Sequence, residues 1–433
     1  MKIKNSQLHL LNATKLISPD VGILSYVSKL PIMNNDPDLM AYGIWPCNTE
    51  VLGAEEYGGR SSGCGYEWEG AFMSTIGETV ERYCPAFYQL DEAIEGTYHS
   101  IGKPAVHPSE YALFHEKQYA DERYTLLPFT EERMLHWFPM TDLTDGKEKW
   151  VPGGMIYIPW THDAEWINVG TSTGLAAHTS LSQATLTALY EIIERDSFVL
   201  TWTQKIVPPK IIIDDEVQGY LDEHFPKHYE WHFFDTTYDL KEPSIFGFCF
   251  GEAEYGKFVA VGTSTRNTLG GALKKVIQEI GQAVSYFRYM LSSTMDYIPS
   301  DNFHELLDFE KHSVFYTKRP DYQFVFDRWR NAVPTKVVDL HEENKETPTE
   351  TVQRILGVMK DKGYNVMFRD MTTVDVNQLG FYSVRLVIPQ LIQMGGAYPF
   401  YYHGAKRLYE VPKLMGYTSY DYDNLNHYPH PFP

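Results

Sequence analysis

The stretch that decides the fold runs from Ser182 to Arg195 and reads S-Q-A-T-L-T-A-L-Y-E-I-I-E-R. Its apolar residues recur near the 3.6-residue period of a helix, and Ser180 or Ser182 can cap the helix start with a hydroxyl group. Steps of four, four and three residues place a polar stripe on one flank of this predicted helix. The stripe consists of Gln183, Thr187, Glu191 and Glu194, and Arg195 follows it.

The same spacing occurs twice more along the chain. Both further stripes lie on predicted helices, of which the later one spans residues 268–291. Each stripe ends in two oxygen-bearing side chains three residues apart, which a helix brings to one side. The members are Gly70, Ser74, Glu78 and Glu81, followed by Arg82, and then Gly271, Lys275, Glu279 and Gln282.

A repeated pentapeptide accompanies the stripes. Residues 169–173 and 261–265 both read V-G-T-S-T, and each follows an apolar run that predicts a strand. A glycine-rich segment, residues 58–65, runs into the first striped helix and lacks the Lys-Ser or Lys-Thr of a Walker loop. Loops of this kind ahead of helices can bind phosphate through their N–H groups, and they are equally typical of plain helix caps. We therefore expect a mixed α/β fold with an internal strand–loop–helix repeat and no P-loop.

Composition excludes several classes of partner. The 433 residues carry 37 basic and 57 acidic side chains, a net charge of −20, which disfavours nucleic acid and anionic membranes and leaves a basic peptide or a basic protein surface open. Four cysteines without metal spacing, no signal peptide and no long apolar span indicate a cytoplasmic setting.

Elsewhere the pattern is less regular. We expect residues 1–60 to be mostly irregular, with a strand and turn near residues 15–24. Residues 202–256 read as strands that include a buried one at 246–250. A helix is expected at 347–362, and strands at 365–368 and 382–389.

The stripes predict a particular chemistry. Carboxylates clustered without His or Cys are hard oxygen ligands, which suit Mg²⁺ rather than Zn²⁺. Magnesium held in this way usually also binds the phosphates of a nucleotide, and nearby cations offset the charge of phosphoryl transfer. The expected metal ligands are Glu78, Glu81, Glu191, Glu194 and Glu279, and the expected cations are Arg82, Arg195 and Lys275. The alternative is that each stripe is a solvated helix face with an internal salt bridge.

Three further features have two readings each. Cys64, between two glycines, is a nucleophile or a buried inert thiol. His178, beside the first pentapeptide, is functional or structural. The chain ends Y-P-H-P-F-P, with Pro429, Pro431 and Pro433 at alternate positions, which favours a stiff extended tail unless the end is disordered.

A family resemblance rests on these residues. The segments Gly77–Arg82, Glu191–Asp196 and Glu279–Gln282 resemble the three signature helices of the YcaO family, and residues 387–389 and 407–409 resemble its C-terminal region. The P-H-P-F-P end is similar to the tail of YcaO cyclodehydratases from azole-modified peptide pathways. The resemblance implies an ATP-binding α/β fold without a Walker loop. It also implies an enzyme that uses ATP to phosphorylate a peptide amide oxygen after attack by a neighbouring Cys, Ser or Thr, which leaves a thiazoline or oxazoline.

The resemblance assigns roles residue by residue. It implies that the first helix supplies Ser74, Glu78, Glu81 and Arg82 to the nucleotide and magnesium site, the second Glu191, Glu194 and Arg195, and the third Glu279 and Gln282. The tail prolines 429, 431 and 433 correspond to an active-site element. The chain departs from the family at Gln183, where many members have Glu, and at Cys64, where many have Lys. Gln183 would therefore ligate magnesium more weakly.

The resemblance also implies an assembly. We expect residues 1–54 to form a segment packed on the main domain, and residues 55–433 to form one catalytic domain without a leader-binding module. The expected partners are a ribosomally made precursor peptide, a leader-binding protein of the ubiquitin-activating-like or peptide-clasp type, a flavin dehydrogenase and a second copy of the chain. Two alternatives stay open: a thioamide- or amidine-forming enzyme on the same fold, and a non-catalytic scaffold subunit.

Overall fold

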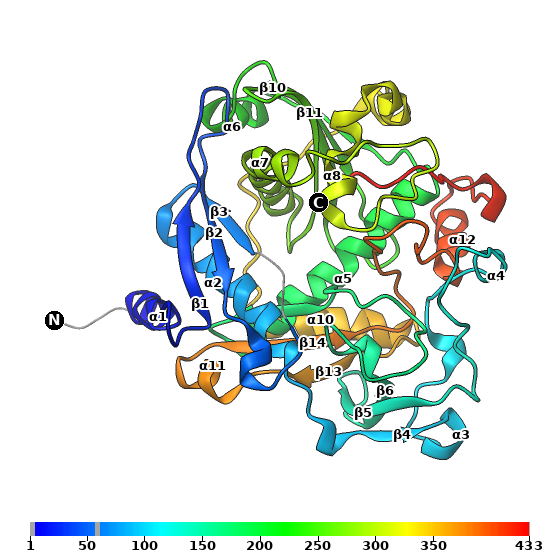
Figure 1. Ribbon diagram of the computed structural model, residues 1–433. Helices are drawn as coiled ribbons and strands as arrows, with labels where there is room; N and C mark the ends of the chain where they lie inside the picture. The colour runs from blue at the N-terminus through cyan, green and yellow to red at the C-terminus, as the bar shows by residue number, and fades with distance from the viewer. Residues whose placement is uncertain (1–4, 57–60, 433) are drawn as a thin grey trace.

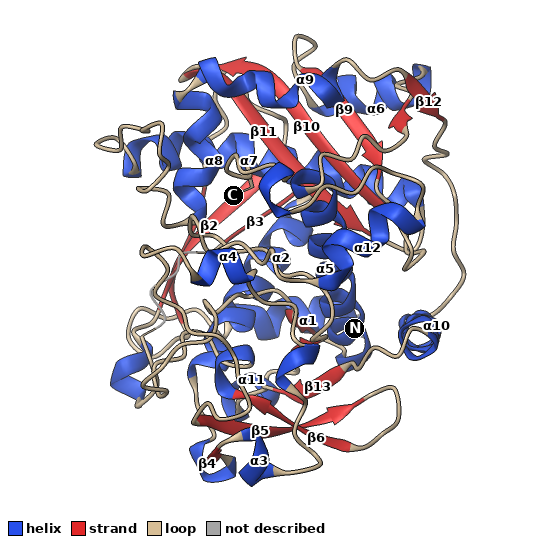
Figure 2. Cartoon of the chain, turned by 90° about the vertical axis from the view of Figure 1, so that its right-hand side faces the viewer, coloured by secondary structure: helices blue, strands red, loops and turns tan. Residues whose placement is uncertain are grey.

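A computed structural model of the chain describes residues 5–56 and 61–432. Helices α2 (Trp68–Tyr83), α5 (Leu181–Thr203) and α7 (Leu269–Ser293) contain the three predicted stripes. Figures 1 and 2 show α2 and α5 between two larger sheets. The mixed α/β class is confirmed. Within the described residues, no helix is long and apolar enough to cross a bilayer.

The N-terminal part forms a small antiparallel sheet in the order β1-β2-β3, with β1 at Leu24–Lys29, β2 at Met40–Pro46 and β3 at Ser62–Gly65. Helix α2 packs against β2 and β3, and α1 (Asn5–Thr14) contacts α2. The prediction of an irregular segment is therefore wrong for α1, β1 and β2. Helix α1 has a weak amphipathic pattern, and its contact with α2 does not show in the sequence. Part of the predicted glycine-rich loop is strand β3, and residues 57–60 lie outside the described residues.

A second sheet has the order β4-β5-β13-β14-β7, with β6 on the other side of β5. It contains the predicted strands near 365–368 and 382–389 as β13 and β14. Helix α10 (Pro348–Asp361) is the helix predicted at 347–362, and Thr347 caps it. The strand bounds are β4 Ile94–Gly96, β5 Leu135–Asp142, β6 Glu148–Pro152, β7 Leu175–His178, β13 Met367–Asp370 and β14 Tyr382–Val387.

The third sheet has the order β11-β10-β9-β8-β12, and α7 packs on β10 and β11. Residues 246–250 lie in β10 as predicted. Helix α6 (Asp215–His224) interrupts the region predicted as strands, and the Asp214 side chain caps it by accepting from the N–H groups of residues 216 and 217. The strand bounds are β8 Lys210–Ile211, β9 Glu230–Asp235, β10 Ser244–Ala253, β11 Gly256–Thr265 and β12 Pro334–Lys336.

Helix α5 connects the two larger sheets. Its N-terminal half packs in a core with Val384 and Leu386 of β14 and with α10, because Ala188, Leu189 and Ile192 lie on that face. Its C-terminal half packs in the main core with Phe246 and Phe248 of β10. The remaining helices lie around this frame, as α3 Tyr98–Ile101, α4 Glu116–Tyr119, α8 Phe309–Lys318, α9 Asp327–Arg330, α11 Val374–Gln378 and α12 Lys406–Leu414.

The repeated pentapeptide does not form a repeated strand–loop–helix unit. Residues 169–173 are a loop, but no strand precedes it directly in the described chain, and β7 follows it before α5 begins. Residues 261–265 are the end of strand β11, paired with β10 along their whole length. The predicted internal repeat is therefore wrong for both copies, because pairing with β10 extends the strand through the second copy.

Candidate functional site

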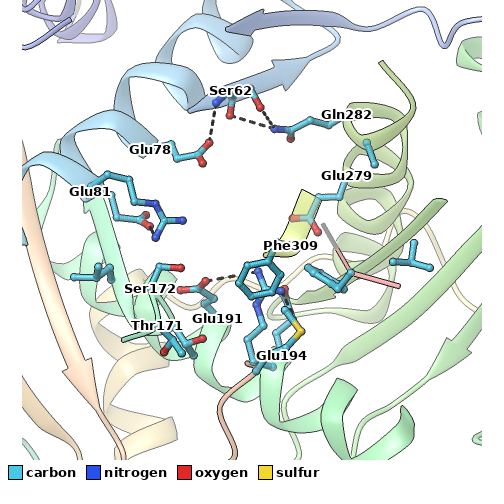
Figure 3. Close-up of a pocket in the computed structure, with 18 of the residues that line it drawn as sticks. Ser62, Glu78, Glu81, Thr171, Ser172, Glu191, Glu194, Glu279, Gln282 and Phe309 are labelled. Carbon is cyan, nitrogen blue, oxygen red and sulfur yellow. Dashed lines mark hydrogen bonds and ion pairs between the residues drawn. The ribbon is translucent and has the colours of Figure 1, made fainter. Parts of the chain in front are cut away.

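The ends of the three stripes meet at one cavity of about 530 Å³. Figure 3 shows Glu78 and Glu81 reaching into this space from one side, Glu279 from the opposite side, and Glu191 and Glu194 from below. These side chains belong to α2, α7 and α5, which are far apart along the chain. The predicted cations Arg82, Arg195 and Lys275, together with Gln282 and Thr187, line the same cavity.

Four members of the stripes do not line the cavity, namely the glycines Gly70 and Gly271 and the side chains of Ser74 and Gln183. Ser74 is exposed on α2, and Gln183 is part-buried near the start of α5. Both lie at least one helical turn before the glutamates of their own stripes, and neither lines the cavity. The cavity therefore faces only the later turns of α2 and α5, which the spacing alone does not reveal.

Strand β3 links α2 to α7 beside the cavity. The backbone N–H of Ser62 donates to Glu78 Oε2 at 3.3 Å. The amide Nε2 of Gln282 donates to the carbonyl oxygen and to the hydroxyl of Ser62, both at 3.1 Å. Figure 3 shows these contacts as dashed lines. Gln282 thus orients β3 with its amide nitrogen, and Glu78 is held in place by β3.

The two copies of V-G-T-S-T each flank one glutamate of α5. Gly174, directly after the loop copy, donates its N–H to Glu191 Oε2 at 3.0 Å. In the strand copy, the hydroxyl of Thr263 donates to Glu194 Oε1 at 3.0 Å, and the N–H of Thr265 donates to Glu194 Oε2 at 3.2 Å. Both carboxylates are therefore oriented by donors from outside their own helix.

Each predicted cation lies beside a glutamate. The nearest N···O distances are 3.7 Å for Arg82 with Glu81, 3.8 Å for Arg195 with Glu191, and 3.5 Å for Lys275 with Glu279. The Arg195–Glu191 and Lys275–Glu279 pairs are the i, i+4 salt bridges that the alternative interpretation predicts. All three pairs face a shared cavity rather than bulk solvent, because their six side chains line it.

The carboxylates carry more negative charge than these cations offset. Burial, partly offset by Arg82, raises the pKa of Glu78 and raises that of Glu81 further. Burial and then the nearby Glu279 raise the pKa of Glu194 to about 8. Such shifts record a site where negative charge is unfavourable without an added cation.

A divalent cation fits this donor set when phosphate oxygens complete its shell. Within the described residues, no three His, Cys, Asp or Glu side chains lie close enough together to hold a metal ion by themselves. Magnesium is commonly held by one or two carboxylates together with substrate phosphates and water, so separated glutamates are the expected arrangement.

The C-terminal tail is buried beside the cavity. Tyr316 donates its hydroxyl to the carbonyl oxygen of Pro429 at 2.7 Å, and His430 Nε2 lies 2.7 Å from the carbonyl oxygen of Gly395. Phe432 lines the cavity, and the guanidinium of Arg195 lies 4.2 Å from its ring centroid. Pro429 and Pro431 are buried but do not line the cavity. Pro433 lies outside the described residues.

Several lining residues escaped the sequence analysis. Tyr286 and Met290 continue the stripe of α7 by two further steps of four, so the spacing could have revealed them. Arg266 directly follows the second pentapeptide, and this position could have marked it as a candidate site residue. Others carry no comparable pattern, and they include Ser62, Leu175, Ala283, Phe309, Glu310, Met394 and Phe432.

The two residues with open readings lie outside the cavity lining. Cys64 is buried, its Sγ lies 3.4 Å from Gln282 Oε1, and burial raises the pKa of the thiol to about 11. Such a thiol is a poor nucleophile near neutral pH. His178 is exposed at the end of β7, where its Nδ1 accepts from the N–H of Ser180 at 3.2 Å. Both geometries favour the structural reading.

Comparisons with known proteins find solved structures that share this fold. A heterocyclase solved in complex with substrate and cofactor superimposes with a TM-score of 0.76 at 20% identity, covering 99% of this chain and 57% of that one. YcaO from Methanopyrus kandleri, bound with AMPPCP and Mg²⁺, gives 0.60 at 16% identity over 89% of each chain. The E. coli microcin synthetase McbBCD complex with pro-MccB17 bound gives 0.60 at 18% identity, over 95% of this chain and 100% of that one.

These likenesses show a shared fold. The chain spans little more than half of the heterocyclase bound to substrate and 50% of the heterocyclase TruD. No curated protein matches the sequence. The family model described as the ATP- and Mg²⁺-binding YcaO cyclodehydratase matches residues 62–392, which span all three striped helices and both pentapeptides. The chain therefore belongs to the YcaO family.

Proposed function

We propose that this protein is an ATP- and Mg²⁺-dependent cyclodehydratase that forms azolines in a ribosomally made peptide. A Cys, Ser or Thr side chain attacks the preceding backbone carbonyl carbon, and the former amide oxygen then takes the terminal phosphoryl group of ATP. ADP leaves in that step. Phosphate leaves when the C–O bond breaks and the ring nitrogen forms its double bond. The peptide loses the elements of one water per ring, and ATP becomes ADP and phosphate.

The observation that carries the proposal is the convergence of five glutamates from α2, α5 and α7 on one cavity that four basic side chains also line. Phosphoryl transfer asks a protein mainly for positioning and for charge stabilisation. Separated carboxylates that face a shared space, with the pKa raised at Glu78, Glu81 and Glu194, suit a magnesium-bound polyphosphate better than they suit a packed core.

We propose different roles for the residues according to where they lie in the site. Glu78, Glu81, Glu191, Glu194 and Glu279 would hold magnesium, which would neutralise phosphate charge. Arg82, Arg195 and Lys275 would contact the phosphoryl oxygens, since each ends in the cavity. Gln282 would orient β3 at the rim of the site. Ser74 and Gln183 do not line the cavity, so we propose no direct ligand contact for them.

The far side of the cavity would receive the peptide. Its walls include Tyr286, Met290, Phe309 and Phe432, which are apolar or aromatic and can exclude water from the reacting amide. The tail would help by placing Phe432 against Arg195, while the buried Pro429 and Pro431 keep the backbone stiff. We propose that the tail positions the peptide and Arg195, and that it takes no proton itself.

A partner protein completes the proposal. This chain covers only 57% and 50% of the two heterocyclases of this fold, and one fold relative comes from a complex called McbBCD. We propose that this chain works with a separate leader-binding protein. A flavin dehydrogenase, a second copy of the chain and a cytoplasmic location belong to the same proposal, as does the division into residues 1–54 and 55–433.

Mass spectrometry of the peptide, combined with a phosphate assay, tests the function. The protein is mixed with the proposed leader-binding protein, the precursor peptide, ATP and Mg²⁺. We expect the loss of one water mass per ring, matched by one phosphate. A gain of sulfur would instead indicate thioamide formation. If the peptide mass does not change and ATP stays intact, the enzyme assignment is contradicted and a scaffold role is favoured.

A further inference from the structure

A buried arginine lies behind the loop copy of the pentapeptide. Arg385 of β14 is 2% exposed. Its Nη1 donates to the carbonyl oxygen of Thr171 at 2.9 Å, and its Nε and Nη2 donate to the carbonyl oxygen of Met155 at 2.9 and 2.7 Å. One guanidinium therefore fixes the main chain at the point where it becomes the lining of the cavity, since Thr171, Ser172 and Thr173 all face that space.

The surroundings of Arg385 differ from those of the cations inside the cavity. Arg82, Arg195 and Lys275 each have a glutamate oxygen within 4 Å. The three hydrogen bonds of Arg385 go to neutral carbonyl oxygens, and the part of the chain that the structure describes gives it no ion pair. Burial lowers the pKa of Arg385 to about 10, a shift that the more distant Glu191 opposes. The group therefore stays charged at neutral pH.

The neighbouring strand makes this charge still more costly. Arg369 of β13 lies directly opposite Arg385 in the β13–β14 register, and like charges in this position destabilise a sheet. Arg369 is compensated, because Glu92 lies 2.9 Å from its Nη2 and Gln89 also accepts from it. Arg385 has no carboxylate within 4 Å in the described part of the chain, and Glu191 and Glu81 act on its charge from farther away. A buried charge without a direct ion pair is expensive to fold, and an anionic ligand nearby would offset part of that cost.

We infer that Arg385 is a positioning residue for the phosphates of the bound nucleotide. It holds the hydroxyl-bearing loop of residues 171–173 in place and adds a positive charge behind that loop that has no direct ion pair of its own. This inference rests on the proposed function, because the ligand it serves is the polyphosphate of ATP. An electrostatic role of this kind acts more strongly on a ligand with more phosphate charge, whereas a purely structural role weakens all nucleotides alike.

Calorimetric titration of AMP, ADP and AMPPCP, each with Mg²⁺, separates these two roles. We expect Arg385→Gln to weaken AMPPCP about tenfold or more and AMP by about twofold at most, with ADP between them. Arg385→Lys keeps the charge but cannot donate to both carbonyl oxygens at once, so it should weaken the three nucleotides less than Arg385→Gln does and about equally. Arg369→Gln is the matched control, and it should change no affinity by more than about twofold.

Equal losses for the three nucleotides in Arg385→Gln, or an unchanged AMPPCP affinity in that variant, would overturn the inference. If Arg385→Gln does not fold, Arg385→Met, which also removes the charge, decides by the same criterion: a graded loss supports the inference and a uniform or absent loss overturns it. A wild-type protein that binds none of the three nucleotides would overturn the proposed function itself. A wild-type protein that binds them, combined with a flat pattern in the variants, would overturn only the role of Arg385.

Discussion

The pentapeptide V-G-T-S-T occurs twice in this protein and adopts two structures. Residues 261–265 pair with β10 one by one, from Val261 opposite Phe248 to Thr265 opposite Ser244. Residues 169–173 form a loop whose carbonyl oxygens accept from side chains instead, namely Tyr402 at Val169 and Arg385 at Thr171. Their neighbours decide the difference, because one copy meets a strand and the other meets polar side chains.

The two copies nevertheless support the same helix. The loop copy leads to Gly174, whose N–H donates to Glu191, and the strand copy gives Glu194 two donors. The shared sequence therefore supplies hydrogen-bond donors to the carboxylates of α5 from two directions. The comparison teaches that a repeated sequence can keep its role in a site without keeping its secondary structure.

Neutralising the two supported carboxylates is expected to have the largest effect. We expect Glu191→Gln and Glu194→Gln each to slow ATP-dependent phosphate release on the order of a thousandfold, because each removes a fixed charge from a preorganised site. The amide keeps the size and one acceptor of the carboxylate, so the helix should stay folded. Glu223→Gln, on the exposed surface of α6, is the control and should leave the rate unchanged. A loss in only one variant would show that just one copy of the pentapeptide supports a functional residue.

Gly174 tests the loop copy. Its φ is +91°, and a Cβ there would come within 2.4 Å of the carbonyl oxygen of Leu386. We expect Gly174→Ala to lower the free energy of unfolding by about 3 kcal/mol, from left-handed strain together with a clash against backbone. Chemical denaturation measures this change. A loss below about 1 kcal/mol would show that the loop can shift away from Glu191 at little cost.

The pH dependence of nucleotide binding tests the strand copy. Burial and the nearby Glu279 raise the pKa of Glu194 to about 8, so below that pH the free protein holds a proton on this carboxyl. Binding a magnesium nucleotide favours the charged form, so the proton must leave. We expect the affinity for AMPPCP with Mg²⁺ to rise as the pH increases to about 8 and then to level off. Glu194→Gln should reduce this dependence, and parallel profiles for both proteins from about pH 6 to about pH 9 would contradict the assignment.

Much of the site was predictable, because helical periodicity survives over long segments. The five glutamates of the stripes on α2, α5 and α7 could be named from spacing, and all five line the cavity. The same spacing also suggested Ser74 and Gln183, which do not. The spacing of a stripe predicts which face of the helix its side chains share. Which turns of that face line a cavity depends on how the helices cross, and the spacing does not predict that.

Other features carried either no local signal or one that a competing pattern outweighed. Arg385 looks like an ordinary strand residue until the fold places the carbonyl oxygens of residues 155 and 171 around it. Phe432 was hidden behind the prolines of the tail, which do not line the cavity themselves. Helix α6 was missed although Asp214 is a clear N-cap, because the apolar runs around it favour strands. These residues acquire their roles from contacts across more than a hundred positions, or from competition between local patterns.

The second residue of each copy gives the smallest and most direct test of the comparison. In the strand copy, a Cβ on Gly262 would lie 3.1 Å from both the carbonyl oxygen of Val276 and Ile280 Cγ1, since β11 packs closely on α7. In the loop copy, a Cβ on Gly170 would find its nearest neighbour, Ile158 Cγ1, at 3.8 Å. We expect Gly262→Ala to cost about 1–2 kcal/mol of unfolding free energy, and Gly170→Ala to stay within about 0.5 kcal/mol of wild type.

Denaturation of the two variants side by side measures this difference, and each serves as the control for the other. The same substitution should cost more unfolding free energy in the strand copy than in the loop copy, because only the strand copy packs closely against a helix. Equal costs would mean that the local sequence rather than the packing sets the tolerance at this position. A larger cost at Gly170 would instead indicate that the cavity-lining loop is packed more tightly than its 3.8 Å gap implies.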